Sequence, residues 1–257
     1  MRLGVFGIST FIIALICLVY NATGLDSRPL RRWQSRMLNR LVGVRVVVRG
    51  TQSDAAPQLV VANHISYFDI TVLASLVKGE FVARGDMATW PFFGFVSKAA
   101  KVVFIDRRRS AASQARDQLQ ERLESGTTLI MFPESTSGDG NIMKPFKSAL
   151  FNVAERHVKD KNGNDRAVVV QPVSIAYTRL NGMPLGVGWR AFVAWYGDME
   201  LPSHLWQVAK LGKITCEVIF HPAVSLADFP DRKALAAHCD RVTRTGFAQL
   251  LAGRVPA

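Results

Sequence analysis

Residues 59–69 read LVVANHISYFD, a short apolar run that leads through polar residues into a second apolar group. The β-branched run 59–62 is typical of a buried strand, whereas residues 68–77 have the apolar spacing of a helix. A strand that turns directly into a helix is the repeating unit of α/β proteins. Residues 63–67 therefore lie in a turn at a strand end, where such proteins place functional side chains.

The alternation of strand and helix continues along the chain after Gly43. Short β-branched runs predict further strands, and amphipathic segments, one of which opens with Trp90-Pro91, predict further helices. The expected strands are 44–48, 80–84, 102–106, 127–132, 168–177 and 214–220, and the expected helices are 110–124, 147–157 and 231–251. We therefore expect residues 44–257 to form one α/β domain without internal repeats.

The first 43 residues differ from the rest in composition. No charged residue occurs from 3 to 20, and a helix through this stretch would be about 27 Å long, just enough to cross the hydrocarbon core of a bilayer. The next segment has apolar residues at helical spacing beside several arginines, as in a helix at a membrane interface. We expect residues 1–43 to be N-terminal membrane helices, and both a span with an interfacial helix and an embedded hairpin fit.

The charge of the chain suits a polyanionic partner, since the formal net charge is +12 and the pI is about 10.1. Five arginines follow the first apolar stretch and only Arg2 precedes it, which favours an anionic membrane over nucleic acid. The same asymmetry places the domain on the cytoplasmic face of the cell inner membrane and argues against a cleaved signal peptide. The three cysteines have no metal-binding or disulfide spacing, which fits a reducing compartment.

His64 and Asp69 form a candidate catalytic pair within the opening stretch. Histidine can accept a hydroxyl proton near neutral pH, and a carboxylate can fix its tautomer and stabilise the cation that forms. Five residues along a regular helix rotate by about 500°, which would leave the two side chains about 140° apart. They can therefore meet only if His64 lies in the turn before the helix.

Three further blocks follow at predicted strand ends. In the first, FIDR at 104–107, Arg107 follows the predicted strand and lies in a loop. A guanidinium there can hold a phosphate or carboxylate through two hydrogen bonds. FPEST, at 132–136, brings Glu134 and two hydroxyl groups to a turn that could bind a polyol. QPVSI, at 171–175, alone is typical of an edge strand with a proline. Taken singly, the first two blocks also fit a basic surface and a solvated turn.

Together and in this order, the blocks resemble those of the glycerolipid acyltransferase family, which includes 1-acylglycerol-3-phosphate acyltransferases. The N-H-x-x-x-x-D block of the family matches Asn63, His64 and Asp69, and the resemblance covers roughly residues 44–222. Glycines common in the family are replaced at three places, Lys101, Ser135, and Ser148 or Ala149. The side chain of Ser135 is expected to make a left-handed backbone less accessible there.

The resemblance implies an acyltransferase that needs no metal or other cofactor. His64 would be the general base, oriented by Asp69, and Arg107 would hold the acceptor phosphate. The donor would be the thioester of acyl-carrier protein or of coenzyme A, and the acceptor lysophosphatidate, giving phosphatidate. Another lysolipid, such as lyso-ornithine lipid, is the alternative acceptor. The remaining acceptor-binding residues would be Glu134, Ser135 and Thr136.

Two other kinds of function fit less well. A basic membrane- or nucleic-acid-binding module without catalysis would account for the charge but not for the four ordered blocks. A covalent acyl-enzyme on serine is disfavoured because the sequence contains no G-x-S-x-G elbow.

Overall fold

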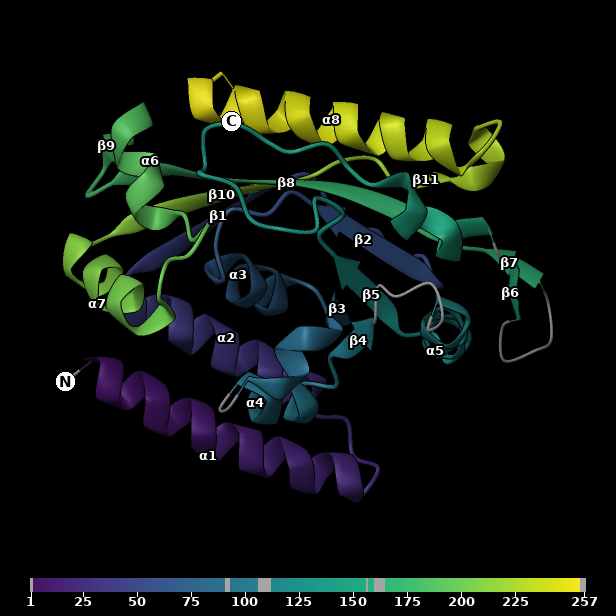
Figure 1. The fold of residues 1–257 in the computed structure, drawn as a ribbon, viewed down its shortest axis with the longest axis horizontal. Coiled ribbons are helices and arrows are strands. Elements are labelled where there is room, and N and C mark those ends of the chain that lie inside the picture. The colour runs from purple at the N-terminus through teal and green to yellow at the C-terminus, as the bar shows by residue number, and fades with distance from the viewer. Residues whose placement is uncertain (1, 91–92, 106–111, 156, 160–164, 255–257) are drawn as a thin grey trace.

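The structure, a computed structural model, describes residues 2–90, 93–105, 112–155, 157–159 and 165–254 (Figure 1). Its centre is a mixed sheet with the strand order β1-β10-β8-β2-β5-β3-β4. The four strands β2, β5, β3 and β4 run parallel to one another and to β8, and β10 runs antiparallel to β8. The predicted α/β class is therefore confirmed. The bounds are β1 (Val44–Arg49), β2 (Gln58–Ala62), β3 (Gly79–Arg84), β4 (Val103–Ile105), β5 (Thr128–Met131), β8 (Val169–Leu180) and β10 (Ile214–Phe220).

Helices cover both faces of this sheet (Figure 1). Helix α8 (Arg232–Ala252) lies along one face, while α3 (Phe68–Leu76), α2 (Arg28–Val42) and α1 (Arg2–Ala22) are stacked in that order beyond the other. Helix α4 (Phe93–Ala99) packs against α1, and α5 (Ala112–Glu124) packs against β4 and β5. The remaining elements are η1 (Gly85–Thr89), η3 (Ser148–Glu155), β6 (His157–Lys159), β7 (Asp165–Ala167), β9 (Met183–Pro184), α6 (Val187–Val193), α7 (Leu201–Leu211), β11 (Val224–Ser225) and η4 (Leu226–Asp228).

Two sequence-based expectations about elements need correction. The helix expected at 147–157 is the shorter 3-10 helix η3, whose buried side chains are Phe151, Val153 and Ala154, and residue 157 already belongs to β6. The strand with Pro172 is not at an edge, since β8 lies between β10 and β2. Pro172 is tolerated there because it lies opposite His221, one residue beyond the end of β10, where no ladder bond is lost.

Two of the positions that lack the family glycine keep a left-handed backbone. Lys101 has φ 55° and Ser135 has φ 69°, so the expectation that a side chain would discourage this conformation is wrong for Ser135. Lys101 follows α4, and its N–H donates to the carbonyl of Lys98, as in a helix that ends with a left-handed residue. The surrounding structure therefore imposes the conformation at both sites, at a cost of roughly 1–2 kcal/mol each.

The N-terminal segment forms two helices, as predicted, and α2 is part of the core. Leu38 and Val42 of α2 are buried, and Val42 belongs to the same cluster as side chains of α3. Leu30 and Met37 pack against a buried cluster formed by residues of α1 and α4. Within the described part of the chain, no helix has both the length and the apolarity needed to cross a membrane. The exposed apolar side chains of α1 form a row, Ile8, Phe11, Ile12, Leu15, Ile16 and Val19.

Lys101→Gly is expected to raise the free energy of unfolding by about 0.5–1 kcal/mol, because glycine adopts a positive φ without strain. Lys98→Gly is the matched control within α4, where helical geometry makes glycine unfavourable, and it should lower the same quantity by about 1 kcal/mol. Chemical denaturation of both variants measures the two signs. A loss of stability in Lys101→Gly would contradict the assignment of strain.

Candidate active site

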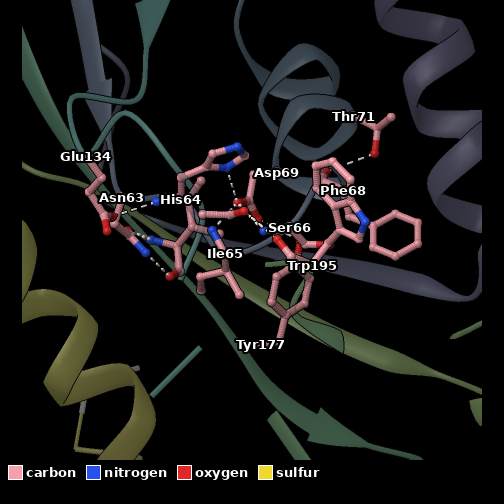
Figure 2. A network of polar contacts seen from close by, with 12 residues as sticks. Asn63, His64, Ile65, Ser66, Phe68, Asp69, Thr71, Glu134, Tyr177 and Trp195 are labelled. Carbon is pink, nitrogen blue, oxygen red and sulfur yellow. Dashed lines mark hydrogen bonds and ion pairs between the residues drawn. The ribbon is translucent and has the colours of Figure 1, made fainter. Parts of the chain in front are cut away.

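The turn between β2 and α3 lies at the carboxyl end of a central parallel strand (Figure 2). Asn63 holds it against β8, since its amide nitrogen donates to the Ile175 carbonyl (2.9 Å) and its oxygen accepts from the Ile175 N–H (2.7 Å). Asn63 is itself buried, so these two bonds satisfy its polar groups. The end of β2 is thereby fixed, and with it the position of His64.

The Asp69 carboxylate is fully buried and accepts four hydrogen bonds (Figure 2). Its Oδ2 accepts from Nδ1 of His64 (2.8 Å) and from the N–H groups of Ile65 (2.6 Å) and Ser66 (2.9 Å). Its Oδ1 accepts from the Tyr177 hydroxyl at 2.8 Å. The first turn of α3 adds the favourable field of a helix N-terminus. The contact predicted between His64 and Asp69 across the turn is therefore present.

The bond to Asp69 selects the tautomer of the His64 ring. Because a carboxylate oxygen only accepts, Nδ1 of His64 carries a hydrogen, and in the neutral imidazole the lone pair is then on Nε2. The ring is stacked on Phe132, with centroids 4.1 Å apart and planes at 12°. Its side chain is 17% exposed, and among the described residues only Nδ1 of the ring has a hydrogen-bond partner. This arrangement can accept a proton from a hydroxyl group.

Glu134 holds the backbone of the same histidine. Its Oε1 accepts from the His64 N–H at 2.8 Å, and its Oε2 accepts from the Lys144 N–H at 2.7 Å. The Gly138 N–H donates to the His64 carbonyl, so both backbone groups of His64 are bound by the segment 134–144. Burial raises the pKa of the Glu134 carboxyl to about 7, against the opposing effect of the two N–H donors. Glu134 thus joins two loops beside the imidazole.

The remaining predicted site residues are Ser135, Thr136 and Arg107. Ser135 and Thr136 follow Glu134 in the same turn, where Thr136 is exposed and Ser135 partly so. Asp106 and Arg107 lie outside the described residues, so the role expected for Arg107 stays a prediction.

Tyr177 and Trp195 were missed by the sequence analysis. Strand alternation from Ile175 was a signal that Tyr177 points the same way, whereas nothing local to 195–199 indicates contact with the turn. The Trp195 N–H donates to the Ile65 carbonyl at 3.0 Å, and its carbonyl accepts from the Ser137 hydroxyl. The Tyr67 ring meets Trp195 edge-on, with centroids 5.9 Å apart. An aromatic wall therefore borders the turn.

The order of the blocks and the geometry of the turn agree with comparisons to known proteins. A family model described as Acyltransferase matches residues 44–176, which contain the turn, Asp69 and Glu134. The chain belongs to the acyltransferase family. The resemblance to glycerolipid acyltransferases noted from the sequence is thereby confirmed.

Two relatives and one solved structure illustrate the range of this acyltransferase family. The lyso-ornithine lipid O-acyltransferase of Brucella abortus is 37% identical over 228 residues, which cover 88% of this chain and 85% of the relative. The 1-acyl-sn-glycerol-3-phosphate acyltransferase of Neisseria gonorrhoeae is 30% identical over 69% of this chain and 64% of its own. The crystal structure of the 1-acyl-sn-glycerophosphate acyltransferase of Thermotoga maritima has the same fold, with a TM-score of 0.62, 22% identity and full coverage of both chains.

Glu134→Gln is expected to flatten the dependence of this acyltransferase's stability on pH. The native carboxyl keeps its proton up to about pH 7, whereas the ordinary value for the unfolded chain is 4.5. The native state therefore binds more protons between these values. Raising the pH through this window lowers the free energy of unfolding, by up to about 3 kcal/mol.

Melting temperatures measured from pH 4.5 to 8 test this prediction. Glu121→Gln, at an exposed position of α5, is the control and should leave the slope unchanged. Equal slopes in wild type and Glu134→Gln would show that Glu134 is not the titrating group.

Proposed function

We propose that this acyltransferase moves a fatty acyl chain from a thioester to the free hydroxyl of a lysolipid, with His64 as general base. The observation that carries the proposal is the geometry of His64, whose Nδ1 is bound to a buried carboxylate at 2.8 Å. This hydrogen bond aligns the imidazole and directs Nε2, rather than Nδ1, toward the hydroxyl whose proton a general base must accept.

The proposed reaction is a direct transfer. Nε2 of His64 removes the proton of the acceptor hydroxyl while the oxygen attacks the thioester carbonyl carbon. The tetrahedral intermediate collapses, the carbon–sulfur bond breaks, and the leaving thiolate takes the proton from the imidazolium. Asp69 stabilises the transient positive charge on His64, and its four hydrogen bonds prevent it from turning away. No metal or additional cofactor takes part in this sequence.

We propose lyso-ornithine lipid as the acceptor, in place of the lysophosphatidate that the motif order favoured. The support is the greater identity and coverage of the relative named for lyso-ornithine lipid. Lysophosphatidate is the second candidate, supported by the FIDR and FPEST blocks and by the Neisseria relative. Arg107 would serve either lipid, because a guanidinium binds a carboxylate or a phosphate through two hydrogen bonds. Glu134, Ser135 and Thr136 would shape the acceptor side.

The donor and the location complete the proposal. The donor is the thioester of acyl-carrier protein or of coenzyme A. The enzyme lies on the cytoplasmic face of the inner membrane, with the apolar row of α1 inserted among the lipids. Helix α2 packs against α1, and its arginines suit anionic head groups.

His64→Ala should abolish acyl transfer while leaving the protein folded, and Asp69→Asn should reduce the rate by about two or more orders of magnitude. Labelled acyl donor is offered with lyso-ornithine lipid and, in parallel, with lysophosphatidate. We expect wild type to use the ornithine lipid by a wide margin. Turnover by His64→Ala would remove the proposed base, and use of lysophosphatidate alone would replace the proposed acceptor without affecting the base.

Replacing Ile8, Ile12, Leu15 and Val19 with glutamine should weaken binding to vesicles of zwitterionic phosphatidylcholine by more than about tenfold, because each side chain loses its apolar transfer energy. Deleting residues 1–43 would be a poor test, since it removes the buried Leu38 and Val42. The matched control replaces four exposed apolar residues elsewhere, Val48, Ile142, Met183 and Val187. Equal vesicle binding by both variants would contradict insertion of α1.

A further inference from the structure

A cavity of about 510 Å³ lies at the end of α3 remote from the active site. It is lined by the last two turns of α2, the start of β1, the end of α3 and Lys213. Asp69 lies in the first turn of α3, and Ser75 and Leu76 end the helix, so about 9 Å of helix separates the cavity from the catalytic turn. We call it the α2–α3 cavity, and it is distinct from the site of acyl transfer.

The α2–α3 cavity has a strong positive charge. Arg36, Arg40, Arg45 and Lys213 line it, and no carboxylate is among the residues that surround it in the described chain. Arg36 donates through Nε to the Ser75 carbonyl at 3.3 Å, which leaves its two terminal nitrogens for a ligand. Over the described residues, Arg40, Arg45 and Lys213 form no ion pair.

All four side chains are exposed, and no carboxylate among the lining residues balances their charge. An anion bound between them would provide that balance. Guanidinium groups match the oxygen geometry of a phosphate. The side chains of Asn39 and Ser75 are already hydrogen-bonded to Thr71 and Val72, so the cations would make the contacts with the ligand. The cavity is therefore suited to a phosphate ester.

The position of the α2–α3 cavity indicates where that phosphate comes from. Trp33, which is 57% exposed, precedes Arg36 and Arg40 on the outer face of α2, and tryptophan favours the level of lipid head groups. Helix α1, with its exposed apolar row, lies directly beside α2 (Figure 1). If the exposed row of α1 is inserted among the acyl chains, the cations of α2 lie at the depth of the lipid phosphates.

We propose that the α2–α3 cavity binds the phosphate head group of an anionic membrane lipid, which is neither acyl donor nor acceptor. The bound head group would set the orientation of the enzyme on the membrane and keep the turn with His64 facing the layer from which the acceptor comes. This inference rests on the proposed membrane contact of α1, but not on the identity of the acceptor.

The test compares two triple variants of the full chain. The cavity variant carries Arg40→Gln, Arg45→Gln and Lys213→Gln. The control carries Lys233→Gln, Arg241→Gln and Arg254→Gln, which remove the same charge from exposed positions on or just after α8, across the sheet. Binding is measured by flotation with vesicles of phosphatidylcholine alone and of phosphatidylcholine with phosphatidylglycerol. Acyl transfer in detergent micelles reports whether each variant is folded.

We expect the cavity variant to bind the phosphatidylglycerol vesicles about 100-fold more weakly than wild type, with the control within about threefold. Binding to phosphatidylcholine alone and activity in micelles should be unchanged in both variants. Lys213→Glu, which leaves α2 intact, should by itself lower binding to the anionic vesicles by about tenfold.

Three results would overturn the proposal. Equal losses in the two triple variants would show that the charge acts diffusely. Unchanged vesicle binding in Lys213→Glu would show that the cavity is not the site. Intact vesicle binding in the cavity variant, with lost affinity for inorganic phosphate or coenzyme A in solution, would assign the cavity to a soluble phosphate. Loss of binding to phosphatidylcholine alone by the cavity variant would place the effect on α1 and would also overturn the proposal. Loss of micellar activity would mean that the triple variant is misfolded, and Lys213→Glu then decides.

Discussion

A carboxylate without exposure to water is stable only if its oxygens find donors, and Asp69 finds four of them. Two are successive N–H groups of the turn, so the backbone must curl around the carboxylate before α3 can begin. The third is the Tyr177 hydroxyl, which requires β8 to lie beside β2 in the observed register. The fourth is His64, whose tautomer follows from the bond. The turn, the placement of β8 beside β2 and the tautomer of the histidine are thus all tied to one buried carboxylate.

Glu134 fixes the backbone of His64, as Asp69 fixes its imidazole ring. Its two oxygens accept the N–H groups of His64 and Lys144, which come from segments far apart in the sequence. His64 is therefore held from two sides, by Asp69 at the ring and by Glu134 at the main chain. Such double support limits the freedom that a general base would otherwise have to leave its productive position.

The sequence was sufficient for the parts of the fold that depend on local patterns. The β-branched runs and the spacing of His64 and Asp69 predicted the strands and the contact across the turn, because periodicity and helix geometry are local properties. The sequence was insufficient where the role of a residue depends on contacts with residues far away in the chain. The sequence of the turn did not indicate that Glu134 is buried and accepts two backbone N–H groups. Tyr177 and Trp195 contact the turn only because β8 lies beside β2 and the segment near 195 folds back onto residue 65. Pro172 was misjudged because its tolerance depends on where β10 ends.

Ser135 has a consequence for how relatives of this enzyme are recognised. The left-handed turn after Glu134 is present although the residue that makes such a turn easy is absent, so the shape of the loop persists independently of glycine. A search pattern that demands glycine at this point would reject the chain, whereas one written for the conformation would accept it. The same holds at Lys101. Motif definitions for these enzymes would therefore be more inclusive if they specified a backbone torsion angle in place of a letter.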